Sequence, residues 1–304
     1  MKIGFALPVS GSWATPDNQA HVARRAEELG YHSAWTFQRL LFPADPTSPR
    51  WLPSYRSVAD PIVSLAFVAG LTSRIRLGVA VLNMPFFSPV LAAKQLGTLD
   101  IASGGRLDVG LGLGWSPQEY AAVGIPRARR GERAEEFLRQ LKGLWTADIA
   151  DDDGAFWQLQ AVRMAPKPVQ QPHPPVLLGG FAEAALRRAG RLADGWISGS
   201  GADLGALGKS VTTVRDAARS AGRDPERLRF VCRGVVRVRD GGAADRHPLT
   251  GSLQEIRGDL EQIRAQGMTE LFVDLNFDPE IGSEDADPAE SMRRAEEVLE
   301  ALAP

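Results

Sequence analysis

One pattern runs along the whole chain: a short apolar run rich in β-branched residues, then a segment with helical periodicity. The pattern predicts eight strands, at Lys2–Leu7, Ser33–Phe37, Arg74–Leu82, Leu107–Leu111, Val176–Leu178, Gly195–Ser198, Leu228–Val238 and Leu271–Leu275. Strands that alternate with helices form parallel sheets, and repetition without a hairpin signal favours a closed barrel over an open doubly wound sheet. The sequence therefore predicts a single (β/α)8 TIM barrel domain over residues 1–304.

The expected helices begin at recognisable signals. A capping side chain precedes a proline at Thr15-Pro16, Asp60-Pro61, Ser88-Pro89 and Asp287-Pro288, and Ser252-x-x-Glu255 reads as a capping box. Three stretches are longer than an ordinary loop: Arg39–Ala59, Trp115–Arg130 and Asp148–Pro175. Because insertions that follow barrel strands shape the active site, these insertions are expected to lie near it.

Composition excludes several classes of protein. Lys and Arg number 35 against 37 Asp and Glu, a balance that gives no electrostatic footprint for nucleic acid. The single cysteine, Cys232, forms no internal disulfide, and the four histidines are scattered, so no metal site is expected. No apolar run reaches the roughly 18 residues of a membrane span, and the first residues lack a signal-peptide pattern. A cytoplasmic protein is expected.

Glycine and polar residues mark the ends of several predicted strands. One glycine-rich run, Gly110-Leu-Gly112-Leu-Gly114-Trp115, has two interpretations. Glycines allow close packing at a strand end in a narrow barrel, or their lack of side chains lets a flat ring lie against the backbone. Gly179-Gly180, which precedes a helix, is either an anion site or a plain tight turn. Asn83, Gln38 and Arg39 would point at the catalytic end of the barrel.

Three stretches together carry a family resemblance: RIRLGVAVLNMPFFSPVLAAKQLGTLDIASGGRLDVGLGLGW, GIPRARRGERAEEFLRQLKGLWT, and PKPVQQPHPPVLLGG with RRAGRLADGWI. In order and spacing they resemble the luciferase-like monooxygenase superfamily, and within it the oxidoreductases that use the deazaflavin coenzyme F420. The resemblance implies a bacterial-luciferase-like barrel, a homodimer, and a flavin or deazaflavin bound at the carboxyl ends of the strands.

The resemblance also assigns residues. A non-prolyl cis peptide is expected at Ala80-Val81, a polar contact to the ring edge at Asn83, a phosphate-binding turn at Gly179-Gly180, and a substrate-side wall at Pro8. The full set of cofactor residues expected on this basis is Ala80, Val81, Asn83, Gly112, Leu113, Gly114, Trp115, Leu178, Gly179, Gly180 and Phe181. Substrate is expected to contact Pro8, Trp13 and Trp51.

Two positions depart from the family pattern. Gln38-Arg39 stands where the deazaflavin enzymes usually have Asp-His, and Phe181 where a phosphate-binding Ser is usual. An arginine stays protonated near neutral pH and cannot act as a general acid or base. Arg39, beside Gln38, is instead expected to stabilise negative charge on a reduced ring or to hold a substrate carboxylate. The lost serine removes one hydrogen bond to a charged group, about 1.5–3 kcal/mol.

Three functions stay open. The leading hypothesis is hydride transfer between F420 and a small organic substrate. The second is an FMN-dependent monooxygenase that uses reduced flavin and O₂, and the third is a barrel that has lost its cofactor and acts as a binding protein. Arg127, Arg129 and Arg130 would form a basic track for the acidic tail of F420, or else are solvated loop charges.

Overall fold

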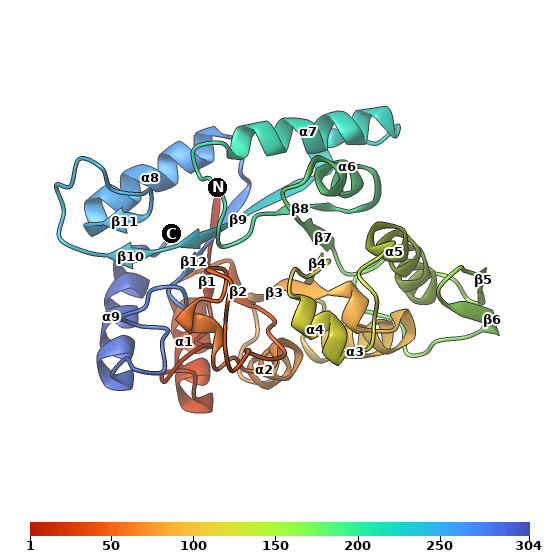
Figure 1. Cartoon of the computed structure of the whole chain (residues 1–304), viewed down its shortest axis with the longest axis horizontal. Helices are drawn as coiled ribbons and strands as arrows, with labels where there is room; N and C mark the ends of the chain where they lie inside the picture. Colours follow the sequence, from red (N-terminus) through yellow and green to blue (C-terminus); the bar gives the residue numbers. More distant parts are fainter.

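Eight parallel strands close into a barrel in the computed structural model, which describes residues 1–304. The strands are β1 (Lys2–Ala6), β2 (Ser33–Thr36), β3 (Arg76–Asn83), β4 (Leu107–Gly112), β7 (Val176–Gly179), β8 (Gly195–Ile197), β9 (Arg229–Val235) and β12 (Glu270–Asp274). Their order around the ring is β1-β12-β9-β8-β7-β4-β3-β2, and each neighbouring pair is parallel. The predicted (β/α)8 barrel is confirmed, and each predicted strand overlaps one of these (Figure 1).

Helices follow the strands and cover the outside of the barrel (Figure 1). They are α1 (Pro16–Glu28), α2 (Pro61–Ala69), α3 (Pro89–Ala102), α5 (Arg130–Thr146), α6 (Glu183–Leu192), α7 (Leu207–Ser220), α8 (Leu253–Ala265) and α9 (Pro288–Ala301), with the short α4 (Pro117–Ala122) between β4 and α5. The predicted starts are confirmed: the side chains of Thr15, Asp60, Ser88 and Asp287 cap their helices, and Ser252 closes a capping box. These caps satisfy backbone N–H groups that have no partner inside the helix.

The predicted strand Leu228–Val238 is wrong at its carboxyl end. The barrel strand β9 stops at Val235, and the next residues form β10 (Arg237–Val238), which pairs in parallel with β11 (Thr250–Gly251) outside the barrel. An apolar run shows no break where a strand changes its partner, so local pattern alone could not locate this end.

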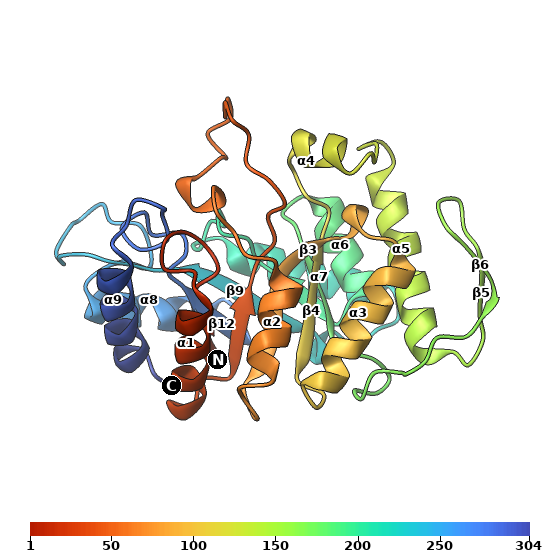
Figure 2. The same ribbon diagram turned by 90° about the horizontal axis from the view of Figure 1, so that it is seen from below.

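The absence of a hairpin signal was also misleading. Within Asp148–Pro175, β5 (Ala150–Asp153) and β6 (Gln158–Val162) form an antiparallel hairpin. Aspartate is a poor strand former, which hid β5. The hairpin is fixed by tertiary contacts instead: Arg139 pairs with Asp152 at 2.6 Å, and Glu136 accepts three backbone N–H groups from the hairpin turn. It lies at the flank of the barrel, away from the strand ends, so the expectation that Asp148–Pro175 lies near the active site is wrong for this hairpin (Figure 2).

Charged side chains close the amino end of the barrel interior. Buried Asp108 binds Arg76 and Arg229 at 2.6 Å each, and Arg229 also binds Glu270 at 2.8 Å. Burial by itself would raise the pKa of Asp108, but the two guanidinium groups outweigh it and hold that pKa below its usual range. Above this layer, the rings of Trp35 and Phe272 stack at 5.0 Å and fill the middle of the barrel.

Only the carboxyl end of the barrel is therefore left for a ligand. In the side view, the segment between β2 and α2 rises above this end together with α4, whereas both chain termini lie at the opposite end (Figure 2). The long insertions Arg39–Ala59 and Trp115–Arg130 thus lie where the sequence predicted them.

Candidate active site at the carboxyl ends of the strands

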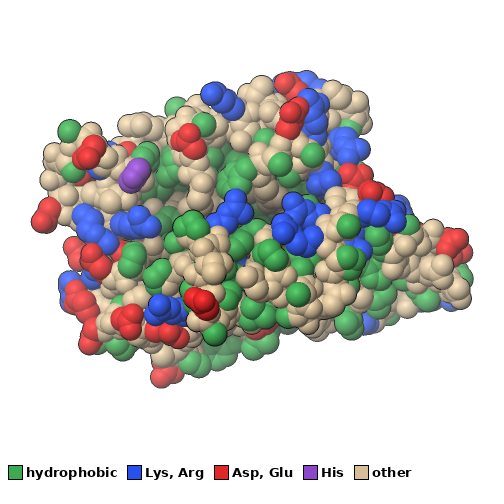
Figure 3. Space-filling view, in the orientation of Figure 1, with side chains coloured by type: hydrophobic (Ala, Val, Ile, Leu, Met, Phe, Trp, Pro, Cys, Tyr) green, Lys and Arg blue, Asp and Glu red, His purple; other side chains and the backbone are tan.

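The three strands that carry the predicted cofactor residues are neighbours. β3, β4 and β7 follow one another around the ring, and their pairing sets Leu82, Leu111 and Leu178 at one level. One residue further on, Asn83 lies opposite Gly112. The face of the molecule that carries α4 is hollowed at its centre, with hydrophobic side chains in the hollow and Lys and Arg side chains along one side (Figure 3). The fold thus brings the predicted set together on one arc of strand ends.

The expected cis peptide is confirmed at Ala80-Val81. Pairing of β3 with β4 shifts register between Val79 and Leu82, around this peptide. The Ala80 carbonyl accepts a hydrogen bond from Arg233 Nη1 at 3.1 Å, so a charged side chain from the opposite side of the barrel contacts the bulge.

Gly112 and Gly179 form a socket for Val81. A Cβ on Gly112 would lie 2.5 Å from Val81 Cγ2, and one on Gly179 would lie 3.2 Å from Val81 Cγ1, whereas a Cβ on Gly110 would collide with the Val79 carbonyl. These distances are shorter than or near the ordinary carbon–carbon contact. Of the two readings of the run, close packing is therefore the one that the geometry supports for Gly110 and Gly112.

The loop that follows β4 is fixed by two other contacts. Gly114 has φ +69°, and a Cβ there would lie 3.2 Å from both Asn83 Cγ and Phe86 Cζ. The Leu113 carbonyl accepts a hydrogen bond from the Tyr120 hydroxyl. Burial raises the pKa of Tyr120, partly offset by nearby arginines, so the hydroxyl keeps the proton that it donates.

Two side-chain amides are free to bind a ligand at these strand ends. Gln38 Oε1 accepts the backbone N–H of Asn83 at 2.9 Å, which leaves Gln38 Nε2 buried without a partner. The carboxamide of Asn83, which rests against Gly114, makes no hydrogen bond of its own within the chain. A buried amide donor without a partner is costly, so its presence indicates a ligand acceptor. Amide donors and acceptors above an apolar floor fit the edge of a flavin or deazaflavin ring.

The structure gives Arg39 a partner that the sequence did not indicate. Its Nη1 donates to Glu119 Oε2 at 2.6 Å, and both side chains are buried. Three aromatic rings surround the guanidinium, those of Trp51, Tyr55 and Trp115. Its charge is thus already neutralised by the chain, and the role expected for it on a reduced ring or a substrate carboxylate stays a prediction.

The double-glycine turn offers backbone donors only. Gly180 has φ +136°, a Cβ on it would lie 2.7 Å from Ala185 Cβ, and its carbonyl accepts the Trp196 Nε1–H at 2.9 Å. No side chain caps α6, which begins just after the turn. Phe181 is 54% exposed and lies over Gly199. Free N–H groups at a helix start favour an anion, but Phe181 adds no hydrogen bond.

The residues expected at the substrate are covered by the chain itself. Pro8 and Trp51 are buried, and Trp13 is fully buried, with an indole N–H that has no partner. Trp13 lies in the main hydrophobic core, and Trp51 packs on Trp115 at 4.7 Å. Their contact with substrate stays a prediction.

A buried ion pair near the site was missed from the sequence. Arg233 on β9 donates to Asp274 on β12 at 2.6 Å, and its guanidinium lies over the rings of Phe37 and Phe277 at 4.7 and 4.4 Å. The available signal was a charge inside each of two apolar runs, FVCRGVV and LFVDLNFD. A charge at such a position is buried and must be paired.

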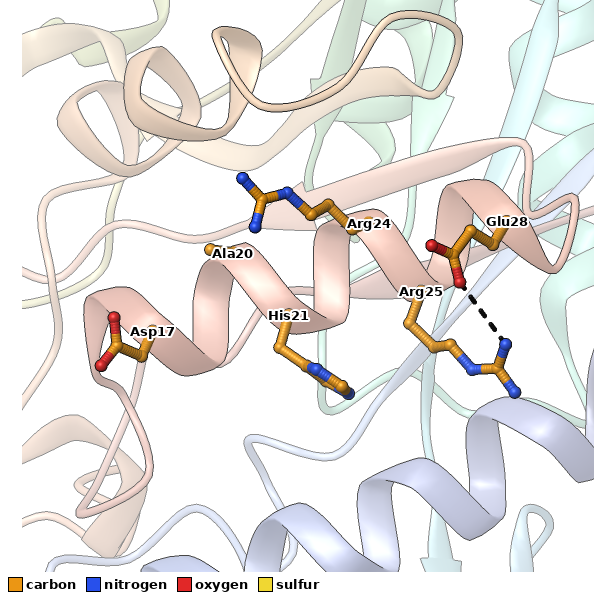
Figure 4. A pocket seen from close by; sticks show the side chains of 6 residues that line it. All are labelled: Asp17, Ala20, His21, Arg24, Arg25 and Glu28. Carbon is orange, nitrogen blue, oxygen red and sulfur yellow. Dashed lines mark ion pairs between the residues drawn. The ribbon is translucent and has the colours of Figure 1, made fainter.

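A hollow on the outer surface does not compete with this site. It runs along α1 and is lined by Asp17, Ala20, His21, Arg24, Arg25 and Glu28 (Figure 4). Arg25 is paired with Glu28, Glu296 and Glu300, and His21 contacts Glu296, so two of the charged side chains that line the hollow, Arg25 and Glu28, are already paired within the chain. No apolar floor is present to hold a ligand.

No cluster of three or more His, Cys, Asp or Glu side chains is arranged to hold a metal ion. Burial raises the pKa of the Cys232 thiol to about 12, which makes it a poor nucleophile. None of the helices is long and apolar enough to cross a membrane.

Comparison with known proteins gives a family and a fold. Residues 1–301 match the family model described as luciferase-like monooxygenase. An uncharacterised protein of Mycobacterium tuberculosis is 34% identical over 239 residues, 74% of this chain and 82% of that protein. The FMNH2-dependent dimethylsulfone monooxygenase of Pseudomonas putida is 37% identical over 163 residues, 53% of this chain and 44% of that protein.

Solved structures are similar over the whole chain. The monooxygenase RslO1 from Streptomyces bottropensis has a TM-score of 0.82 at 24% identity, with 99% of this chain and 98% of that chain covered. An F420-dependent secondary alcohol dehydrogenase has a TM-score of 0.80 at 16% identity, with 100% and 99% covered. At this identity the likeness shows the fold alone.

Proposed function

The chain belongs to the luciferase-like monooxygenase family, and from this we propose that it is an oxidoreductase that binds F420 at the ends of β3, β4 and β7. A hydride would pass between the deazaflavin and a small organic substrate. The observation that carries the proposal is the buried, unpartnered Gln38 Nε2, which lies next to the Asn83 carboxamide that makes no hydrogen bond within the chain, beside the glycine-lined loop.

The residues of this chain would bind and orient the ring, which itself supplies the redox chemistry when bound. Asn83 and Gln38 would hold its polar edge, and the backbone of Leu113 and Gly114 would line it. The turn at Gly179-Gly180 would hold phosphate through backbone N–H groups. No acid–base side chain replaces the family histidine at Arg39, because an arginine does not release its proton near neutral pH.

Two features favour a deazaflavin over FMN. The phosphate of FMN is a monoester dianion, whereas that of F420 is a diester with one charge, which suits a turn that lacks the usual serine. F420 also carries an acidic tail, and Arg127 and Arg130 have no carboxylate partner in the chain, whereas Arg129 is paired with Glu132. Basic side chains border the hollow on its α5 side (Figure 3).

A second candidate is an FMN-dependent monooxygenase that uses reduced flavin and O₂. It is supported by the name of the Pseudomonas putida relative, an FMNH2-dependent enzyme, although that match covers about half of this chain. The same arc of strand ends would hold the flavin ring.

Equilibrium binding tests the two cofactors directly. Purified protein is titrated with F420, oxidised FMN and reduced FMN in separate anaerobic experiments, and ligand fluorescence or absorbance is followed. F420 binding at least tenfold tighter than either form of FMN supports the proposal, and the reverse order supports the monooxygenase. Binding of none of them at high micromolar concentration supports the binding-protein hypothesis.

We also propose that the protein is a homodimer through α2 and α3, which pack side by side on one flank of the barrel (Figure 2). Large apolar side chains on these helices face solvent: Val63 is 69% exposed, Leu91 61% and Phe67 42%. An outer helix face of this kind is usually buried against another surface. Phe67→Glu with Leu91→Glu should convert the dimer to a monomer in sedimentation velocity, and an unaltered dimer would place the interface elsewhere.

A further inference from the structure

The contacts of Arg39 join two insertions that are far apart in sequence. Arg39 lies just after β2, at the start of the first insertion. Its partner Glu119 lies on α4, which follows the glycine run of β4. Glu119 Oε2 accepts Arg39 Nη1 at 2.6 Å, and Glu119 Oε1 accepts the backbone N–H of Leu40 at 2.8 Å. The exposed fractions of the two charged side chains are only 6% and 0%, so water cannot replace either one.

Aromatic rings complete the enclosure. The Arg39 guanidinium carbon lies 4.4 Å from the ring centroid of Tyr55, 4.9 Å from Trp115 and 5.1 Å from Trp51. Its Nε is buried without a hydrogen-bond partner, so Glu119 and the rings are what hold it. A planar guanidinium stacks on aromatic faces in a way that an ammonium does not.

The same short helix also holds the loop that follows β4, residues 113–115. Tyr120, next to Glu119 on α4, donates its hydroxyl proton to the Leu113 carbonyl, and Ser116 caps the helix through the N–H of Glu119. Trp115 packs on Trp51 and on Arg39. Residues 113–115 are therefore clamped between α4 and the first insertion.

A six-residue helix has little stability of its own, so its position depends on these contacts. Trp51 and Tyr55 belong to the main hydrophobic core, whereas Arg39 and Glu119 lie on segments outside the eight barrel strands and the eight long helices that cover them. Loss of their contact should release the loop locally and leave the barrel folded.

We propose that Arg39 and Glu119 are positioning residues: their ion pair fixes α4 and thereby sets the wall made by Leu113, Gly114 and Trp115 against which the cofactor ring lies. The inference rests on the proposed function for the identity of the ligand. It assigns to Arg39 a role through Trp115 and Glu119 in place of direct contact with the ring or the substrate.

The test compares Glu119→Gln with Asp259→Asn as a matched control. Buried Asp259 likewise accepts an arginine, Arg246 at 2.6 Å, and a backbone N–H, that of Leu249 at 2.7 Å, but it lies on α8. Both variants keep side-chain shape and remove one buried charge. Arg39→Lys serves as the conservative variant, and Arg39→Met/Glu119→Gln removes both charges together.

The first readout needs no ligand. Hydrogen exchange, followed by mass spectrometry on peptides that cover residues 111–122, should become at least tenfold faster in Glu119→Gln and remain unchanged in Asp259→Asn. The second readout is the dissociation constant of whichever cofactor the wild type binds. It should rise about tenfold or more in Glu119→Gln, less in Arg39→Lys, and stay within twofold in Asp259→Asn.

The double variant separates positioning from stability. The single variant Arg39→Met leaves Glu119 buried without its cation, whereas the double variant leaves no lone buried charge. The double variant should therefore melt at a higher temperature than Arg39→Met, while its cofactor affinity stays weak. Unchanged exchange and affinity in Glu119→Gln would overturn the inference, as would an equal loss of affinity in Asp259→Asn. If the wild type binds no cofactor, the proposed function fails, and the exchange experiment alone then decides whether the pair positions the loop.

Discussion

The packing of Val81 against Gly112 makes a quantitative prediction. A Cβ added at Gly112 would lie 2.5 Å from Val81 Cγ2, about 1–1.5 Å inside an ordinary carbon contact of about 3.5–4 Å. Since the backbone of Gly112 is not in the left-handed region, the effect of Gly112→Ala is steric alone. Overpacking of this kind destabilises the folded protein by about 1–3 kcal/mol. The alanine also lowers the conformational entropy of the unfolded chain, which offsets about 0.4–1 kcal/mol of that loss. We expect a net loss of about 1–2 kcal/mol.

Val81→Ala should behave in a complementary way. Removal of two half-buried methyl groups costs up to about 1.6 kcal/mol, at ~0.8 kcal/mol for each buried carbon. In the double variant the new methyl group at position 112 occupies space that Val81 Cγ2 has left. The total loss should therefore be about 1–2 kcal/mol rather than the sum of the single losses, with a coupling energy of about 1–2 kcal/mol.

Urea unfolding followed by circular dichroism measures all four members of this cycle, and each kcal/mol should shift the melting temperature by roughly 2 °C. Gly143→Ala is the control, because a Cβ there meets nothing within 4 Å and the residue lies inside α5. It should stabilise the protein by up to about 1 kcal/mol. If the losses in unfolding free energy for Gly112→Ala and Val81→Ala simply add in the double variant, the two residues do not pack against each other and the proposed contact is refuted.

Three further outcomes are expected. Asn83→Ala should weaken cofactor binding in a direct titration by roughly tenfold, through loss of an amide contact, and should leave the melting temperature nearly unchanged; equal affinity would remove Asn83 from the site. Arg233→Met should cost about 3–5 kcal/mol in urea unfolding, because it leaves Asp274 buried without its cation. Asp108 has a lowered pKa in the folded state, so its contribution is present above its unfolded value of about 3.9 and is lost as pH falls below it. Acid titration of Asp108→Asn should therefore show a smaller loss of stability below about pH 4, and an unchanged acid profile would contradict this.

Helix starts and strand runs were predictable because they are local. Thr15 and Ser88 cap helices in any context in which a proline and a helical stretch follow, and parallel barrel strands are apolar because both of their faces are buried. The end of β9 and the hairpin of β5 and β6 were not predictable in this way. Each depends on a partner segment that is distant in sequence, or on a contact such as Arg139 with Asp152.

The candidate site divides along the same line. Residue type and strand position were enough to place Asn83, Gln38 and the double glycine at the carboxyl ends of the strands. They were not enough to assign a role to Arg39 or to identify Arg233 as a site residue, because the role of a charged side chain depends on which side chain it pairs with. Glu119 lies eighty positions from Arg39 and Asp274 forty-one from Arg233, and only strand pairing and the packing of the insertions bring them into contact.

The sequence by itself determined the fold class, the helix caps and the family, because these follow from short-range periodicity and local motifs. Only the tertiary structure decided that Gly112 receives Val81, that Gln38 holds Asn83, and that the charge of Arg39 is already neutralised. The physical reason is that close packing and the pairing of buried charges are set by distances between strands and loops, and no local pattern encodes those distances.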